Sequence, residues 1–357
     1  MPPWLKRYRK EAKPLAVPSW RKWLAVGATA ALVAFVALQR TEAAHLLRLL
    51  GRTDWRWLPA PVLCEALFQS NEATIYWLMY RVMGHRTRLP RVIRLTLAAA
   101  FVNRIAPSAG VSGTALFTER MARVGVPPSA TVTVNLARYV LDYGAFALIL
   151  GCGMIYLSLH HELTPVEIRA AATLGALILA LLVVAAVLVS MRSALVAVVT
   201  ALARALNRGV ARLGVGNAVS VDAAAAGVDE ALQAVAVLAH SGRSTAALVC
   251  MGFFIHLFDL AGLWSVFMAV GHPVHLGVLV AGYGLAYLAG FVSLVPSGLG
   301  VFEASMAVVY ASLGVHLAQA VLVTLLYRLF SLWMPVLAGY AALQITLKED
   351  RPNAQAL

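Results

Sequence analysis

Charged residues are scarce in this chain. They make up 13% of its 357 residues, against ~25% in soluble domains, while hydrophobic residues reach 61%. Several uncharged runs, such as 170–191 and 276–302, exceed or match the ~20 helical residues that cross a hydrocarbon core. The composition excludes an ordinary soluble enzyme or binding protein and indicates an all-α polytopic integral membrane protein.

Cysteine is also rare, and no catalytic motif is present. Cys64, Cys152 and Cys250 all lie in expected spans, so we interpret them as small core residues and not as a disulfide framework. The sequence has no G-x-S-x-G elbow, Walker A loop or H-E-x-x-H helix. The His-His-Glu segment 160–162 lacks the spacing of metal ligands on one helical face. We therefore expect no cofactor, no metal and no enzymatic activity.

Acidic residues are outnumbered, with 16 Asp and Glu against 29 Lys and Arg, for a net charge of +13. The basic residues gather in 1–22, 81–94 and 192–212, beside the hydrophobic spans. This is the positive-inside pattern, which also attracts anionic lipid headgroups. Nucleic-acid binding would need a basic face on a soluble domain, and none is visible. The pattern predicts that both termini lie in the cytoplasm. The Ala- and Arg-rich, Lys-poor composition indicates a bacterial protein, so we expect it in the inner membrane.

The chain is expected to form one transmembrane domain, 23–347, after a basic cytoplasmic segment, 1–22. A cytoplasmic connection, 192–243, interrupts this domain, and a short cytoplasmic tail, 348–357, follows it. About six full spans are expected, at 23–39, 58–80, 131–159, 170–191, 244–270 and 317–347. The second span is the least apolar, because it contains Glu65, Gln69, Asn71 and Glu72.

One sequence element occurs twice. Pro107-Ser108 precedes Gly125-Val126 by 18 residues (125−107), and Pro296-Ser297 precedes Gly314-Val315 by the same 18 (314−296). A single offset of 189 (296−107) superposes the two copies. Chance matching is the alternative in a chain so rich in Ala, Leu, Val and Gly. The shared spacing favours an internal repeat.

The two repeat units, around 91–160 and 274–347, are expected to be inverted, each with a Pro/Gly-broken re-entrant helical hairpin. The arms of the first hairpin, 95–106 and 112–122, are too short to span the membrane comfortably. Three spans separate the units, so they enter from opposite sides. Segment 274–294 is long enough to be a full span instead of a hairpin arm. Inverted repeats with broken helices form the substrate sites of many transporters.

Ionisable residues inside spans are costly, and by default they indicate function. Arg138 and Asp142 are four residues apart and His256 and Asp259 three apart, so each pair shares a helix face. Glu303 falls in the first turn after the second break, where a carboxylate suits the free N–H groups of a helix N-terminus. The alternatives are local ion pairs that lock helices together and a plain helix cap.

The candidate substrate-binding residues are the polar and helix-breaking residues of both units. They are Asn103, Arg104, Pro107, Ser108, Arg138, Asp142, Pro296, Ser297, Gly298, Gly300, Glu303 and Arg328. His256 and Asp259 are candidates for energy coupling.

The run LVPSGLGVFEAS, at 294–305, resembles the P-x-G-G-x-G-x-x-E stretch of the lysylphosphatidylglycerol synthase transmembrane (flippase-like) family. Further matches to that family's pattern are Asn103, Pro107, Arg138, Asp142 and Arg328. The resemblance covers roughly residues 20–345. The first unit departs from the pattern, because Thr114 stands where the family often has an acidic residue.

The resemblance implies the flippase half of the two-domain family members, without their soluble aminoacyl transferase. We therefore expect a translocase of a lipid or lipid-linked headgroup, with a phospholipid or a polyprenyl-linked glycolipid as substrate. The alternative is a non-transporting membrane partner of a lipid-modifying or glycosyl-transfer enzyme. An intramembrane enzyme is a third, less favoured reading.

Overall fold

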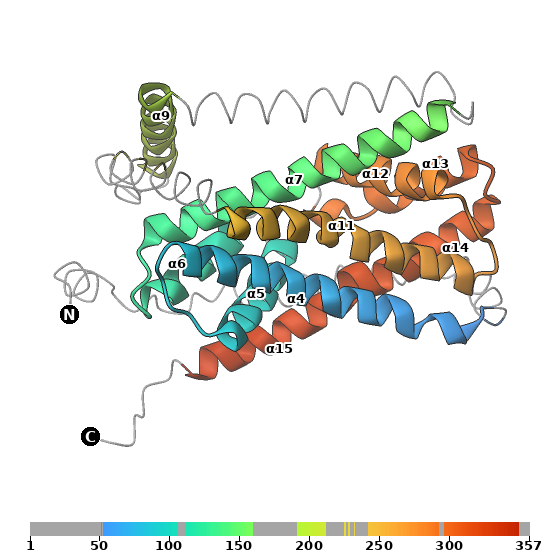
Figure 1. Cartoon of the computed structure of the whole chain (residues 1–357), viewed down its shortest axis with the longest axis horizontal. Coiled ribbons are helices and arrows are strands. Elements are labelled where there is room, and N and C mark those ends of the chain that lie inside the picture. Colours follow the sequence, from blue (N-terminus) through green and yellow to red (C-terminus); the bar gives the residue numbers. More distant parts are fainter. Residues whose placement is uncertain are drawn as a thin grey trace.

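The computed structural model describes residues 51, 53–105, 111–159, 191–211, 225, 228, 232, 242–292 and 296–349, which form helices and turns without any strand (Figure 1). In chain order, the elements are η1 (Trp55–Trp57), α4 (Pro59–Val82), α5 (Leu89–Ile105), α6 (Val111–Ala122), α7 (Pro128–Leu159), α9 (Arg192–Ala211), α11 (Arg243–Ala269), α12 (Leu276–Val292), η2 (Pro296–Gly298), α13 (Val301–Ser312), α14 (Leu317–Arg328), η3 (Leu329–Trp333) and α15 (Met334–Glu349). The expected spans 23–39 and 170–191, the segment 160–162 and the first break at Pro107-Ser108 lie outside the described residues.

Three helical stretches among the described residues are long and apolar enough to cross a membrane: Pro128–Tyr156, Arg243–Ala269 and Leu317–Thr346. They coincide with the spans expected at 131–159, 244–270 and 317–347. Helix α4 has comparable length, 24 residues, but its polar side chains lower its hydropathy. The helical membrane class is therefore confirmed, whereas the count of about six spans stays a prediction.

The basic segment 81–94 is partly helical, because α5 begins at Leu89, with Pro90 in its first turn, where the missing N–H costs nothing. One interpretation of the sequence is overturned. Cys152 and Cys250 are exposed and Cys64 is only half-buried, so their reading as core residues is wrong. In a span that is apolar on all sides, periodicity does not separate lipid-facing from protein-facing positions.

Two helix pairs share the same dimensions. Helices α5 and α12 each have 17 residues, and α6 and α13, which follow them, each have 12. A 17-residue helix is about 25 Å long at 1.5 Å per residue, short of the ~30 Å hydrocarbon core. Figure 1 shows the α5–α6 pair toward one end of the molecule and the α12–α13 pair toward the other.

The two Gly-Val dipeptides play the same structural role, at the ends of α6 and α13. Gly125 and Gly314 follow α6 and α13 with φ of 87° and 89°, a left-handed conformation that glycine adopts readily. The next residues, Val126 and Val315, donate their N–H groups to Met121 and Tyr310, over 3.1 and 3.0 Å. Both valines are buried. Each dipeptide therefore ends a hairpin arm with a glycine cap and a hydrophobic contact, which explains their common spacing.

The interior has two apolar cores with polar residues between them. One core includes Val134 of α7 and Ile255 of α11, and the other includes Phe146 and Leu263 of the same two helices. The ionisable residues of α7 and α11 lie between the core residues just named. We call the group Glu72, Arg138, Asp142, His256 and Asp259 the polar layer.

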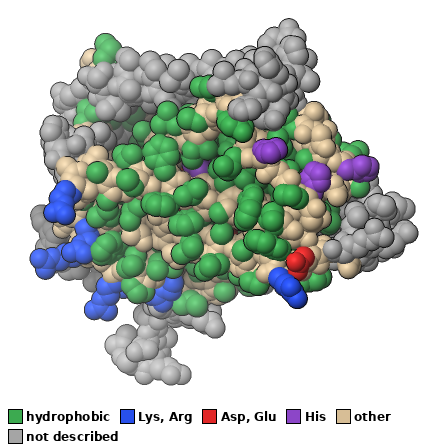
Figure 2. Space-filling view, turned by 45° about the vertical axis from the view of Figure 1, so that its right-hand side comes forward, with side chains coloured by type: hydrophobic (Ala, Val, Ile, Leu, Met, Phe, Trp, Pro, Cys, Tyr) green, Lys and Arg blue, Asp and Glu red, His purple; other side chains and the backbone are tan. Residues whose placement is uncertain are grey.

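The outside of the described helices is apolar. Large exposed side chains include Leu148 on α7, Leu257 on α11 and Leu337 on α15, as expected of surfaces that face lipid. Figure 2 shows hydrophobic side chains over the middle of the molecule, Lys and Arg side chains mainly toward one end, and His side chains toward the opposite side. This distribution is typical of a membrane-embedded body with one basic end.

We predict that the two hairpins enter the membrane from opposite sides. Arg123 lies in the exposed turn after α6, and His316 lies in the exposed turn after α13. Single Arg123→Cys and His316→Cys variants, with the three native cysteines changed to serine, should react with a membrane-impermeant maleimide from opposite faces of oriented vesicles. Labelling of both cysteines from the same face would contradict the inverted arrangement.

Candidate functional site

The second break is a strained and closely packed segment. Ser297 has φ of 55°, the only positive value among described non-glycine residues, while Gly298 and Gly300 have φ of 63° and 83°. A Cβ on Gly298 would lie 2.9 Å from the Cα of Gly290 on α12. Only glycine lets the two backbones approach so closely. A left-handed serine costs about 1–2 kcal/mol, and such strain concentrates at functional sites.

The Glu303 carboxylate makes two contacts, one with each of its oxygens. One carboxylate oxygen accepts the Gly300 N–H over 2.6 Å, which caps α13. The other accepts from Arg328 Nε over 2.5 Å, and both side chains are mostly buried. The structure thus brings together two of the candidate site residues, and Glu303 is a helix cap and an ion-pair partner at once.

Arg328 has two further contacts. Its Nη2 donates to the Ser297 carbonyl over 2.9 Å. Its guanidinium also lies 4.4 Å from the centre of the Phe302 ring, within range of a cation–π interaction. The arginine at the end of α14 therefore holds the irregular backbone of the second break in place.

The second break touches α5, which lies in the predicted first unit. Ser297 Oγ donates to the Arg104 carbonyl over 3.1 Å, and Arg104 Nη2 donates to the Ser331 carbonyl over 3.3 Å. Ser331 lies in the π-helical segment η3. Pro335 has no N–H to offer the carbonyl four residues before it, which leaves the Ser331 oxygen available. The structure thus brings residues from both predicted units together.

Asn103 makes a hydrogen bond within the first hairpin. Its Oδ1 accepts the Gly113 N–H over 2.7 Å, near the N-terminus of α6. A Cβ on Gly113 would overlap the Asn103 amide, so a larger residue there would displace the Asn103 side chain from this hydrogen bond. Pro107 and Ser108, between these two residues, lie outside the described residues. Asn103 thus caps the returning arm of the first hairpin, as Glu303 caps that of the second.

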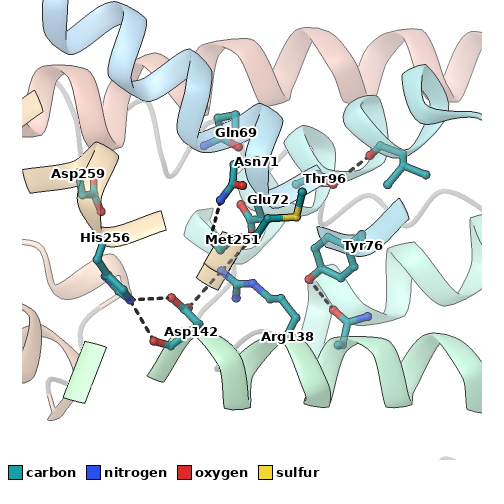
Figure 3. Close-up of polar contacts among 12 residues, drawn as sticks. Gln69, Asn71, Glu72, Tyr76, Thr96, Arg138, Asp142, Met251, His256 and Asp259 are labelled. Atoms are coloured by element: carbon teal, nitrogen blue, oxygen red, sulfur yellow. Dashed lines mark hydrogen bonds and ion pairs between the residues drawn. The ribbon is translucent and has the colours of Figure 1, made fainter. Parts of the chain in front are cut away.

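Arg138 lies at the centre of the polar layer, at the point where α4, α7 and α11 approach (Figure 3). It pairs with Asp142 of its own helix over 3.2 Å and with Glu72 of α4 over 2.9 Å. The predicted Arg138–Asp142 contact is confirmed. Glu72 was not among the predicted site residues, although its position inside an expected span was a signal for it.

His256 pairs with α7 and not with Asp259. Its Nε2 lies 3.2 Å from an Asp142 carboxylate oxygen and 3.0 Å from the Asp142 backbone carbonyl (Figure 3). Its Nδ1 lies 2.9 Å from the Tyr283 hydroxyl on α12. The prediction that His256 and Asp259 form a local ion pair is therefore wrong. The two side chains do not contact each other directly but share Tyr283 as a neighbour.

Asp259 accepts three tyrosine hydroxyls. Tyr283 and Tyr287 of α12 donate to its Oδ2 over 3.1 and 3.0 Å, and Tyr327 of α14 donates to its Oδ1 over 3.1 Å. The sequence contained no signal for these partners, because tyrosines in apolar spans are common and their partners lie on other helices. Tyr327 and Arg328 are adjacent, so the polar layer is continuous with the second break.

No group of three or more His, Cys, Asp and Glu suited to a metal ion occurs among the described residues. The site geometry consists of buried arginines, carboxylates and a broken helix end. A family model described as the lysylphosphatidylglycerol synthase TM region matches residues 22–339. The chain belongs to this family.

Three curated relatives are UPF0104 membrane proteins. The protein of Methanocaldococcus jannaschii is 29% identical over 108 residues, which are 30% of this chain and 32% of the relative. The protein of Methanothermobacter thermautotrophicus is 32% identical over 93 residues, 26% of this chain and 28% of the relative. The protein of Pyrococcus horikoshii is 30% identical over 103 residues, 29% and 30% of the two chains. The aligned part thus spans about a third of each relative's length.

In this member of the lysylphosphatidylglycerol synthase TM-region family, Arg138→Ala should leave the buried carboxylates of Glu72 and Asp142 without their shared cation. Breaking a buried pair costs roughly 3–5 kcal/mol, which should be measurable as lowered resistance to SDS-induced unfolding in mixed micelles. Arg123→Ala is the matched control, because Arg123 pairs with Glu119 at 2.7 Å on the exposed surface. Such pairs contribute below ~1 kcal/mol. Equal losses for the two variants would contradict a structural role of the polar layer.

Proposed function

We propose that this protein translocates a lipid with an anionic headgroup between the leaflets of the cell membrane. The observation that supports this most is the contact of Arg328 and the Gly300 N–H with the two oxygens of one carboxylate, Glu303. These donors lie where the second break meets the first repeat unit. They make up an anion site that an internal anion occupies.

A lipid phosphate has the chemistry to replace that carboxylate. Helix N-termini bind phosphate through free N–H groups and the positive end of the helix dipole. Arginine binds carboxylate and phosphate through the same planar set of donors. Exchange of one anion for another keeps the buried guanidinium of Arg328 neutralised, which avoids the cost of an unpaired charge. Glu303 therefore stabilises the empty site and yields it to a headgroup.

A second arginine offers a further position for the same headgroup. Arg138 is paired with Glu72 and Asp142, and its Nε is buried with no hydrogen-bond partner among the described residues. That donor could serve a phosphate oxygen. Two arginine sites, with Asp259 and its three tyrosine donors between them, suit a headgroup that must move between leaflets inside the protein.

The proposed membrane arrangement follows from the two short hairpins. With the basic end at the cytoplasm, as the positive-inside rule favours, α5–α6 is re-entrant from the cytoplasm and α12–α13 from the opposite side. Irregular backbone at membrane depth is tolerable only where protein or water covers it. Inverted units of this kind allow alternating access to a central site. We propose the bacterial inner membrane as the location.

The family description agrees with a phospholipid substrate, since it names a lysylphosphatidylglycerol synthase. The names of the relatives describe them only as membrane proteins. We propose that the chain performs no covalent chemistry, and that movement of the lipid is its activity. A membrane enzyme that makes or consumes the lipid is the partner that such an activity would serve.

The test uses the purified protein in liposomes containing NBD-labelled phosphatidylglycerol, with movement measured by dithionite quenching. We expect Glu303→Gln and Arg328→Gln to lower the rate at least tenfold, because each removes charge from the anion site. Both variants should stay monodisperse, since glutamine keeps the shape of Glu303 and most of its capping capacity, and an amide at position 328 is neutral and still able to donate a hydrogen bond. Glu119→Gln, which removes an exposed carboxylate, is the control and should move lipid like the unmodified protein.

Two results would overturn the proposal. Unmodified protein that leaves NBD-phosphatidylglycerol in its original leaflet, under any applied ion gradient, would favour the non-transporting membrane partner. Rates in Glu303→Gln and Arg328→Gln equal to that of the control would show that this anion site takes no part in movement. NBD-phosphatidylcholine measured in parallel tests the dependence on net headgroup charge.

A further inference from the structure

We propose that His256, Tyr283 and Asp259 form a proton-carrying site that couples lipid movement to a proton gradient. The coupling rests on the proposed function, whereas the proton site itself rests on geometry alone. The three side chains form one hydrogen-bonded row, with Tyr283 2.9 Å from His256 Nδ1 and 3.1 Å from Asp259 Oδ2. All three are buried in the membrane-spanning body.

The hydrogen-bond partners of Nε2 determine which nitrogen of His256 can titrate. Both groups that face Nε2, the Asp142 carboxylate and the Asp142 backbone carbonyl, are acceptors of hydrogen bonds. Nε2 must therefore hold a hydrogen at all times. Asp142 in turn is held ionised and in place by Arg138, which Glu72 also contacts. Nδ1 is consequently the ring nitrogen that gains and loses a proton.

Among the described residues, Tyr283 is the group that connects His256 Nδ1 to Asp259. A hydroxyl donates one hydrogen and accepts through its oxygen. When Nδ1 holds a hydrogen, it donates to the Tyr283 oxygen and Tyr283 donates to the Asp259 carboxylate. When Nδ1 has lost its hydrogen, Tyr283 donates to Nδ1 and a protonated Asp259 donates to Tyr283. Both directions satisfy every group.

The transfer between these two states is balanced. The N–H bond at His256 Nδ1 breaks as its proton bonds to the Tyr283 oxygen, and the original Tyr283 O–H bond breaks as that proton bonds to Asp259 Oδ2. Imidazolium and carboxylate become neutral imidazole and carboxylic acid, and the tyrosine is unchanged. No oxidant, metal or further reactant is needed.

The surroundings favour exchange of this proton with a site beyond Asp259. Asp259 also faces Tyr287 and Tyr327. It shares a small pocket with Cys64 and Glu65 of α4 and Ser331 of η3. Glu65 is buried and accepts from the Gln69 amide over 2.7 Å. Two carboxyl groups at one pocket disfavour double ionisation, so a proton on Asp259 is stabilised there.

The pocket also provides the connection to lipid movement. Ser331 accepts the hydrogen bond of Arg104, and Tyr327, a donor to Asp259, precedes Arg328 of the anion site. Neutralising Asp259 weakens the hydrogen bond from Tyr327, because a carboxylate is a stronger acceptor than a carboxylic acid. The charge of Asp259 therefore acts on the helix that positions Arg328.

The first experiment follows the ring nitrogens of His256 by ¹⁵N NMR on the full chain in nanodiscs, without any added transport substrate. His256→Gln assigns the signals. Over the range in which histidine titrates, roughly pH 5 to 8, Nδ1 should gain and lose its hydrogen while Nε2 keeps its own. In Tyr283→Phe, Nδ1–H has no acceptor, so Nδ1 should stay unprotonated. Tyr310→Phe, which removes a buried hydroxyl bonded to the Leu279 carbonyl, is the control and should titrate as the unmodified protein does.

The second experiment compares movement of NBD-phosphatidylglycerol with and without an applied pH gradient. The ratio of the two rates should exceed ~3 in the unmodified protein and in Tyr310→Phe, and fall to about 1 in Tyr283→Phe and Asp259→Asn. A constant state of Nδ1 in the unmodified protein, or unaltered titration in Tyr283→Phe, would overturn the proton site. Normal titration without gradient-dependent movement would overturn the coupling alone, and titration without any lipid movement would count against the proposed function alone.

Discussion

A guanidinium inside a hydrocarbon layer has to be neutralised by the protein, because no water or salt is there to do so. Arg138 and Arg328 impose this constraint, and the arrangement of the helices satisfies it. Arg138 requires a carboxylate from its own helix and one from α4, so α4 must lie against α7 at the depth of Glu72. Arg328 requires Glu303, so α14 must return past the beginning of α13. The ion pairs thus fix the relative depth of helices whose apolar surfaces would pack in many registers.

The backbone is under a parallel constraint. A broken helix exposes N–H and C=O groups that lipid does not satisfy. At the second break, Glu303 accepts the Gly300 N–H and Arg328 donates to the Ser297 carbonyl. The residues that neutralise charge are therefore the same residues that satisfy the broken backbone. A ligand that displaces Glu303 would loosen both, which gives anion binding a direct influence on the shape of the hairpin.

Local chemistry was predictable from the sequence, and contacts between helices were only partly so. The Gly-Val repeats, the Pro-Ser break and the i, i+4 pair Arg138–Asp142 follow from short-range geometry. The structure has the Gly-Val dipeptides after α6 and α13, the break at Pro296–Gly298 and the ion pair on α7. The contact of Arg328 with Glu303 joins two residues that the sequence named separately as site candidates. The binding of His256 to Asp142 did not, because i, i+3 spacing favoured Asp259 as its partner. The three tyrosines around Asp259 and the place of Glu72 depend on how α4, α12 and α14 pack, which no periodicity in these uniformly apolar spans specifies.

The central claim is that Glu303 occupies the place of an anionic headgroup. A cryo-electron microscopy structure in nanodiscs of phosphatidylglycerol tests it most directly. The account predicts a state with headgroup density between Arg328 and the Gly300 N–H, with the Glu303 side chain turned away. The same density should be absent from nanodiscs of phosphatidylcholine. Glu303 bound to Arg328 in every particle class, with lipid confined to the outer surface of the helices, would contradict it.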